Sequence, residues 1–153
     1  MHVVLVHPDI AGNTGNVGRT CVATNSTLHL VKPMGFEISD KHLKRAGLDY
    51  WEHLDLRFVE SMEQVEATLF VENNFFLFSR FATQSHWDAN FTKDSVLVFG
   101  SETKGLPKEL LEKYPDRVFG IPMTGPVRSL NLATAVGSVV FEAVRQSNVR
   151  EKP

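Results

Sequence analysis

Short, mostly apolar runs recur along the chain and constrain its fold more than any other feature. They cover residues 3–6, 28–31, 56–59, 75–78, 96–99 and 118–121. Runs of this kind are typical of strands buried on both faces of a parallel sheet, because a sheet with one wet face alternates apolar and polar residues. Segments with helical patterns separate the runs. The order therefore predicts an α/β fold, with a mostly parallel sheet and helices on both of its faces.

The longest apolar segment closes the chain. Residues 118–146 predict a short strand, a loop rich in proline and glycine that carries Arg128, and a long helix that begins near Ser129. Either Ser129 or Asn131 is a suitable cap for this helix. The helix is apolar almost all round, which predicts burial on more than one side. Burial inside one subunit and burial against a second copy both satisfy that pattern.

Polar and glycine-bearing turns follow four of the predicted strands. They comprise residues 7–19, 79–80, 100–107 and 122–131. Ligands of parallel α/β folds bind beyond the carboxyl ends of the strands, so these turns predict one site at that edge of the sheet. The glycines of the first turn match neither the dinucleotide-binding nor the Walker spacing. Glu102 in the third turn is explained equally well as an ordinary turn residue.

Two connecting segments carry further local signals. Asn13 or Thr14 is expected to cap the helix that follows the first strand. Residues 79–93 are polar and predict a loop, which three aromatic side chains are expected to hold against the core: Phe81, Trp87 and Phe91.

Composition bounds the possible classes of function. The chain has 153 residues, a 42% hydrophobic fraction and a net charge of −2, so it predicts a single domain without a general attraction to nucleic acid. Any RNA site must then be a local basic patch. Cys21 is the sole cysteine, which excludes an intrachain disulfide and a thiolate metal cluster and favours a reducing, cytoplasmic setting. No apolar run approaches the roughly 20 residues that span a membrane.

A basic and aromatic cluster lies between the second and third runs. Ser39 or Asp40 is expected to cap a short helix there, and Lys44 and Arg45 precede Tyr50. Cations beside aromatic rings suit RNA, through phosphate contacts and base stacking. A solvated basic helix face explains the same residues equally well.

Five stretches form a set of motifs that share one order along the chain. They are NTGNVGRTC (13–21), PMGF (33–36), KRAGLDY (44–50), VFGSETKGLP (98–107) and IPMTGPVRSLNLATAVGSVVFEAVRQ (121–146). Together they resemble the SPOUT class of RNA methyltransferases, in particular the small single-domain YibK/TrmL group of its TrmH-type branch. The resemblance implies one domain over residues 1–147 and a deep trefoil knot near the carboxyl end, which is very rare among folds. The residues themselves predict a loose tail over 148–153.

The resemblance also implies a cofactor and the residues that hold it. Members of the class bind S-adenosylmethionine in a bent form, largely through backbone groups of the knotted loops, and use no metal. Carried over by position, the cofactor site comprises Phe78, Gly100, Ile121, Ser129 and Leu130. Adenine needs an apolar slot that Phe78 and Ile121 can frame, and glycine at position 100 lets a ligand approach the main chain.

The reaction implied is methyl transfer to the ribose 2′-oxygen of the wobble nucleotide, cytidine or uridine, in a tRNA anticodon loop. Arg19, Ser129 and Asn131 are the implied catalytic residues. A guanidinium stays protonated, so we expect Arg19 to bind the adjacent phosphate and stabilise the developing alkoxide. The residues expected to bind substrate are Arg19, Lys44, Arg45, Tyr50 and Arg128.

The resemblance further implies a homodimer in which the carboxyl-terminal helices meet and each site is completed across the interface. Three alternatives remain open on the sequence: an RNA-binding or cofactor-sensing domain without turnover, an rRNA 2′-O-methyltransferase, and an ordinary doubly wound nucleotide-binding enzyme. The third is disfavoured because the chain carries no phosphate-loop fingerprint.

Overall fold

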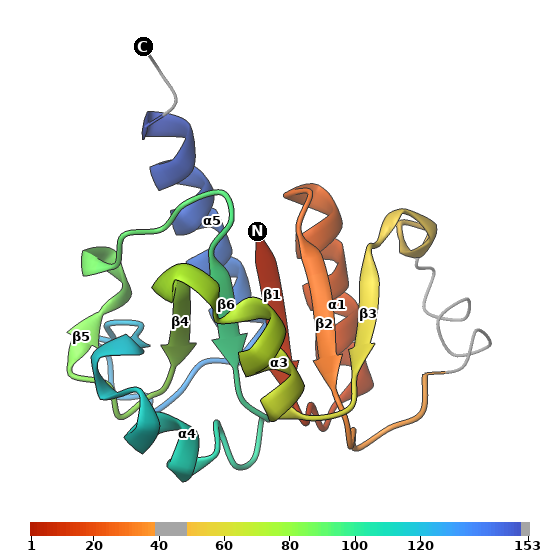
Figure 1. Cartoon of the computed structure of the whole chain (residues 1–153), viewed down its shortest axis with the longest axis horizontal. Helices are drawn as coiled ribbons and strands as arrows, with labels where there is room; N and C mark the ends of the chain where they lie inside the picture. The colour runs from red at the N-terminus through yellow and green to blue at the C-terminus, as the bar shows by residue number, and fades with distance from the viewer. Residues whose placement is uncertain (39–48, 151–153) are drawn as a thin grey trace.

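A parallel sheet occupies the middle of the molecule (Figure 1). The computed structural model describes residues 1–38 and 49–150, and within them the sheet has seven strands. In chain order these are β1 (His2–Val6), β2 (Thr27–Val31), β3 (Leu56–Val59), β4 (Phe75–Phe78), β5 (Gln84–Ser85), β6 (Val96–Phe99) and β7 (Val118–Gly120). Their spatial order is β3-β2-β1-β6-β4-β7-β5, and every neighbouring pair is parallel. The predicted fold class is confirmed.

Helices cover both faces of this sheet. They are α1 (Ala11–Ala23), α3 (Met62–Leu69), α4 (Lys108–Lys113) and α5 (Leu132–Arg150), with short 3-10 helices at Trp51–His53, Val71–Asn73, His86–Asp88 and Pro115–Arg117. In Figure 1, α3 lies in front of the sheet, with α1 and α5 behind it. The layers follow from the sequence, because strands buried on both faces need apolar partners on each side.

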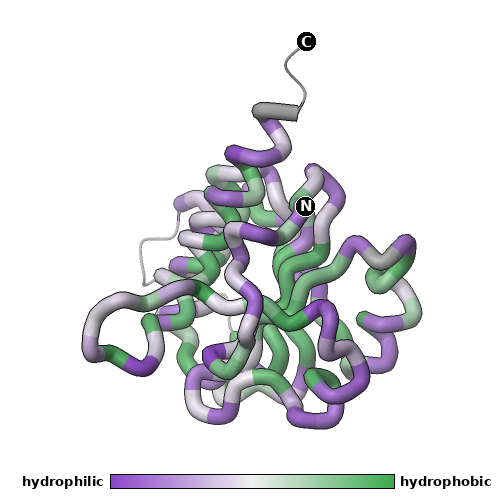
Figure 2. Tube along the Cα trace, turned by 90° about the vertical axis from the view of Figure 1, so that its left-hand side faces the viewer, coloured by the Kyte–Doolittle hydropathy of each residue, from purple (hydrophilic) through white to green (hydrophobic). Residues whose placement is uncertain are grey.

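Alternate side chains of β1 show how the two layers are built. Leu5 packs in one apolar cluster with Val17 of α1 and Val139 of α5. Val4, one residue earlier, packs in a second cluster with residues of α3 and α4, because successive side chains of a strand point to opposite faces. Figure 2, a side view, shows the apolar strands in the middle of the molecule.

Three features differ from the sequence-based expectations. The segment predicted as a loop contains a seventh strand, β5, whose two polar residues give no apolar signal. In that segment Phe91 is fully buried, but Phe81 and Trp87 are 76% and 64% exposed, so of the three aromatic side chains only Phe91 packs in the core. The final helix begins at Leu132 rather than near Ser129, and it continues through Arg150, into the stretch expected to be a tail.

Within one copy of the chain, the carboxyl-terminal helix is enclosed on one side. Val136, Val139, Val140 and Ala143 are buried, whereas Phe141 is 57% exposed. One side of α5 therefore lies against the sheet and the other faces outward.

Among the described residues, no helix combines the length and apolar character that crossing a membrane requires.

Candidate functional site

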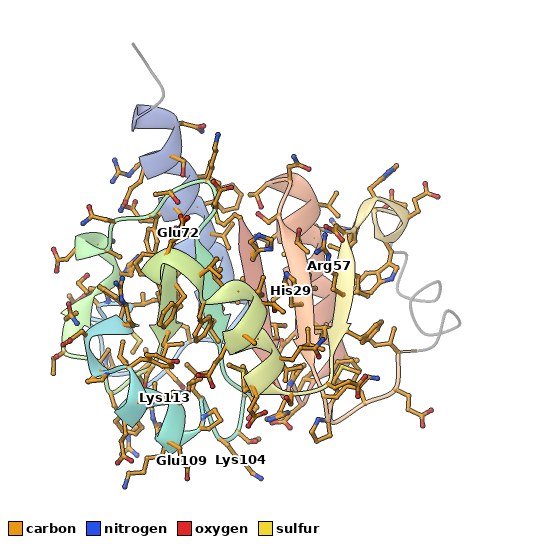
Figure 3. The ribbon with its side chains drawn as sticks, viewed as in Figure 1. His29, Arg57, Glu72, Lys104, Glu109 and Lys113 are labelled. Atoms are coloured by element: carbon orange, nitrogen blue, oxygen red, sulfur yellow. The ribbon has the colours of Figure 1, made fainter. Side chains whose placement is uncertain are left out.

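A cavity of about 1410 Å³ lies beyond the carboxyl ends of the strands. Its walls come from the loops after β1, β2, β4, β6 and β7 and from the start of α5. Residues from all four polar turns identified in the sequence line it. The strands run downward in Figure 1, so this edge of the sheet is at the bottom of the view. Figure 3 places the labelled Lys104 and Glu109 there, and both line the cavity.

The residues expected to hold the cofactor all line this cavity. They are Phe78, Gly100, Ile121, Ser129 and Leu130. Phe78 is 8% exposed and stacks on Phe99, with ring centroids 4.6 Å apart, so it forms part of a rigid apolar wall. Four of these five residues are distant from one another in sequence and come together through the sheet order. Their roles stay predictions.

Nearby backbone of the same chain leaves no room for a side chain at Gly100. A Cβ at this position would lie 1.9 Å from the carbonyl carbon of Gly105 and 2.1 Å from the nitrogen of Leu106. The turn closes on itself there, since the Gly105 amide donates to the Ser101 carbonyl at 2.9 Å, and Gly105 has a φ of +71°. Close approach within the chain therefore explains this glycine without a ligand.

Glu102 joins two of the loops. Its carboxylate accepts hydrogen bonds from the backbone amides of Asp9 and Ile10, at 2.7 and 3.2 Å, and from Asn13 Nδ2 at 3.0 Å. These donors lie at the amino end of α1, where a negative charge is favoured by the orphan amides and the helix dipole. The first residue before α1 is Ile10, which has no side-chain cap, so the predicted capping by Asn13 or Thr14 is wrong.

A chain of hydrogen bonds continues from Glu102 to the last helix. Asn131 Nδ2 donates to Asn13 Oδ1 at 2.9 Å. Asn131 Oδ1 in turn accepts from the amides of Ala133 and Thr134, at 2.9 and 3.3 Å, so Asn131 caps α5. Glu102, Asn13 and Asn131 come from three separate motifs, and the network fixes those motifs relative to one another at the cavity.

A second pair of contacts reinforces the same loop junction. Thr103 donates to Asp9 Oδ2 through its hydroxyl, at 2.6 Å, and through its amide, at 3.3 Å. These hydrogen bonds hold the pKa of Asp9 below its ordinary value. Asp9 therefore accepts hydrogen bonds from the loop of Glu102, and Glu102 accepts hydrogen bonds from the loop of Asp9. Both carboxylates hold the two loops together.

Arg19 lies on α1 and is not among the residues that line the cavity. Its side chain is exposed, and its guanidinium carbon lies 4.7 Å from the ring centroid of Tyr50. The Tyr50 hydroxyl donates to the Gly15 carbonyl at 2.6 Å, and burial raises its pKa. The pairing of Arg19 with Tyr50 brings together two of the residues expected to bind substrate.

The remaining expected residues are placed as follows. Arg128 is exposed on the loop before α5 and is not part of the cavity lining. Lys44, Arg45 and the predicted helix around them lie outside the described residues. Within 1–38 and 49–150, no group of three or more His, Cys, Asp or Glu side chains is placed to hold a metal ion.

Sequence reasoning did not place Glu102 or Asn13 among the site residues. Both belong to the quoted motifs, and the signal for Glu102 was its place in a glycine-bounded turn directly after a buried strand. Their partners lie 89 to 118 residues away along the chain, so no local pattern indicates the contacts.

Comparison with known proteins gives a match along almost the whole chain. The SpoU rRNA Methylase family matches residues 1–141. A Bacillus subtilis protein is 47% identical over 154 residues, which cover 99% of this chain and 96% of that protein, and it carries a provisional name as a tRNA (cytidine(34)-2'-O)-methyltransferase.

Two solved structures share the fold. One, described as giving structural insights into the 2-OH methylation of C/U34 on tRNA, has a TM-score of 0.87, is 46% identical, and covers 95% of this chain and 94% of its own. The other is the SpoU methyltransferase AviRb from Streptomyces viridochromogenes in complex with AdoMet. It has a TM-score of 0.82, is 25% identical, and covers 95% of this chain and 57% of its own.

Proposed function

The chain belongs to the SpoU rRNA methylase family, and on that premise we propose that it is a tRNA methyltransferase. It transfers the methyl group of S-adenosylmethionine to the ribose 2′-oxygen of nucleotide 34, the wobble position of the anticodon. Cytidine is the base named for the Bacillus subtilis relative, and we extend the proposal to uridine because of the C/U34 structure. The observation that carries the proposal is this full-length relationship at 47% identity.

The residues of the cavity fit the proposed cofactor. Phe78, Ile121 and Leu130 give it apolar walls, while the turns around Gly100 and Ser129 present backbone groups. An adenine ring and a sulfonium fit such a mixed site, and the two carboxylates nearest the loop junction are already hydrogen-bonded. S-adenosylmethionine, when bound, supplies an electrophilic methyl carbon.

The chain's own residues must handle the ribose hydroxyl. A 2′-hydroxyl is a poor nucleophile until its proton is lost or shared. We assign Ser129 to orient the ribose, since its side chain is exposed at the cavity. Asn131 acts as a positioning residue, because both ends of its amide hold α1 and α5 in place. Arg19 binds the neighbouring phosphate and stabilises the developing alkoxide.

Arg19 does not line the cavity of its own subunit, so its proposed role requires that it reach another site. We propose that the protein is a homodimer and that Arg19 serves the site of the second copy. Two facts support this arrangement: α1 packs beside α5, and α5 keeps an exposed apolar residue, Phe141, on its outer side.

Subunit mixing tests the assignment of Arg19. Arg19→Ala and Ser129→Ala chains are each expected to lose methyl transfer, and Arg19→Lys to retain little, because one ammonium does not replace a guanidinium fork. After unfolding and refolding together, the two alanine variants should recover about a quarter of the wild-type rate, because half of the chains pair as heterodimers with one intact site. Near-normal turnover of Arg19→Ala, or no recovery on mixing, contradicts the proposal.

The reaction itself is tested by mass spectrometry of nucleosides. Purified protein, S-adenosylmethionine and unmodified tRNA should yield 2′-O-methylcytidine or 2′-O-methyluridine at position 34. tRNAs with cytidine or uridine there measure the base preference. Fragments of rRNA serve as the competing substrate, and methylation of rRNA alone would favour the family's other activity.

We also propose a cytoplasmic location, where the tRNA substrate is found.

A further inference from the structure

The strongest unassigned feature is an aromatic and basic pair at the edge of the cavity. Phe81 is 76% exposed, the most exposed of the large apolar side chains among the described residues. The guanidinium carbon of the neighbouring Arg80 lies 4.6 Å from its ring centroid. Both side chains line the cavity, together with Ile121 and Ser129.

The turn that carries this pair is held in place by its own hydrogen bonds. The amide of Phe81 donates to Ser79 Oγ and the amide of Ala82 donates to the Ser79 carbonyl, each at 3.2 Å. Behind the turn, a Cβ at Gly120 would lie 3.3 Å from the Ala82 methyl group, so the turn sits close against β7. The exposed ring is therefore presented by a fixed backbone directly after β4.

Keeping a phenylalanine ring in water is unfavourable, and apart from the Arg80 guanidinium this ring stays open to solvent in the described part of the chain. A guanidinium on one side of the ring leaves the other side available to a flat partner. The same guanidinium can meet a phosphate, which the net charge of −2 does not otherwise attract. Flat rings joined by phosphates are the chemistry of single-stranded RNA, whose unstacked bases lie on aromatic side chains.

We propose that Phe81 and Arg80 form a stacking platform that binds a base of the RNA substrate at the mouth of the cavity, with Arg80 on the adjoining phosphate. The proposal rests on the function proposed above and adds to it a substrate-binding site outside the predicted residues. Stacking tolerates any base, so the platform contributes affinity for the anticodon loop rather than the choice between cytidine and uridine.

The test compares variants of Phe81 in steady-state methylation of tRNA. Phe81→Ala should raise the KM for tRNA about tenfold, since stacking of one base contributes on that order, and leave kcat within about twofold. Phe81→Trp should restore the KM, whereas Phe81→Leu, which keeps apolar volume without a π face, should not. Arg80→Ala should weaken binding with a smaller salt dependence than that of the wild type.

Trp87 provides the matched control. It is 64% exposed on the same connecting segment and does not line the cavity, so Trp87→Ala should leave the KM for tRNA unchanged. Calorimetric titration with S-adenosylmethionine alone separates the two possible occupants of the platform. If wild type and Phe81→Ala bind the cofactor with equal affinity, the result supports an RNA base as the occupant. If Phe81→Ala loses affinity for the cofactor and not for tRNA, the proposal is overturned. A Phe81→Leu variant with the same KM for tRNA as Phe81→Trp also overturns it.

A binding measurement separates this proposal from the proposed function. An anticodon stem-loop that carries 2-aminopurine loses fluorescence when that base stacks, whether or not methyl transfer occurs. Quenching by the wild type and not by Phe81→Ala supports the platform. If quenching depends on Phe81 but nucleotide 34 is never methylated, the function fails and the platform stands. If methylation occurs without any Phe81-dependent quenching or change of KM, the platform alone fails.

Discussion

At the scale of single residues, Glu102 shows how one carboxylate can organise a site through hydrogen bonds to the protein's own groups. It accepts two hydrogen bonds from backbone amides between β1 and α1 and a third from Asn13 in the first turn of α1, and through Asn13 it reaches Asn131 at the start of α5. Charged acceptors form stronger hydrogen bonds than neutral ones, so the identity of this residue has consequences for stability as well as for the cavity.

Replacement of Glu102 by glutamine is expected to lower the free energy of unfolding by about 1–2 kcal/mol, because an amide NH₂ faces backbone donors in place of an oxygen. The melting temperature should fall by about 4 °C. Urea unfolding and calorimetry measure both quantities. Glu112→Gln is the control, since Glu112 pairs with Lys108 at the surface of α4, where such a pair contributes little. Equal effects in the two variants would contradict the structural role of Glu102.

A histidine pair with one buried and one half-buried ring predicts a dependence of stability on pH. His2 Nδ1 and His29 Nε2 lie 3.1 Å apart on neighbouring strands, and Figure 3 shows His29 beside Arg57 of β3. Burial lowers the pKa of His29 to about 4 from its ordinary value of 6.5, with His2 and Arg57 adding to the effect, and burial also lowers the pKa of His2. Between these values the unfolded chain binds more protons than the folded one, so acid favours unfolding there.

The free energy of unfolding should therefore fall by about 1–2 kcal/mol as the pH is lowered from 6.5 to 5. Urea unfolding at a series of pH values measures the slope. His29→Gln removes one of the two titrating rings and should flatten the slope in this window, whereas His53→Gln, at an exposed position, should leave it unchanged. A His29→Gln variant with the wild-type slope would show that the linkage arises elsewhere.

Single residues also mark the limit of what the sequence could predict. Capping of α5 by Asn131 was one of two options in the sequence, because Ser, Thr, Asn and Asp caps have a local signature. The burial of Phe81 and Trp87 was predicted wrongly, because an apolar side chain in a loop carries no information about what lies above it. The Phe81 platform became visible only once the cavity was known.

At the scale of elements, the strands were the most predictable part of the fold. Strands buried on both faces must be apolar throughout, which leaves a clear signal at β1, β4 and β6. The edge strand β5 is two polar residues paired to β7, so its position is decided by its neighbour. The start of α1 was misplaced for the same reason, since its partner is Glu102 on the turn after the neighbouring strand β6.

The turn after β6 gives a prediction at this scale. Gly100→Ala would place a Cβ within 2 Å of the Gly105 carbonyl carbon, which belongs to backbone and cannot rotate away. We expect a loss of stability of about 3 kcal/mol or more, with loss of cofactor binding because the turn lines the cavity. Gly125→Ala is the control, since its Cβ would meet nothing within 4 Å, and its melting temperature should be unchanged. A Gly100→Ala protein of wild-type stability would show that this turn relaxes freely.

At the scale of the whole molecule, one side of α5 is buried against the sheet and the other exposes an apolar ring. A single copy of the chain does not explain that exposed ring. One side packs on the sheet through Val136, Val139 and Val140. On the other, Thr134, Ser138, Phe141 and Arg145 are exposed at helical spacing. Small side chains beside one large apolar ring suit a helix that packs against another helix. The trefoil knot expected from the resemblance stays a prediction, and the dimer can be tested without it.

Phe141→Asp is expected to convert a dimer into a monomer, because a carboxylate would be buried without a partner at the centre of the interface. Light scattering at micromolar concentration should give twice the 17.2 kDa of one chain for the wild type and a single chain for the variant. Methyl transfer should fall with the mass if Arg19 serves the second copy. Phe58→Asp, at a 46% exposed position on the far edge strand β3, should change neither. A wild-type protein that is monomeric and active would remove the need for a second copy and return Arg19 to its own subunit.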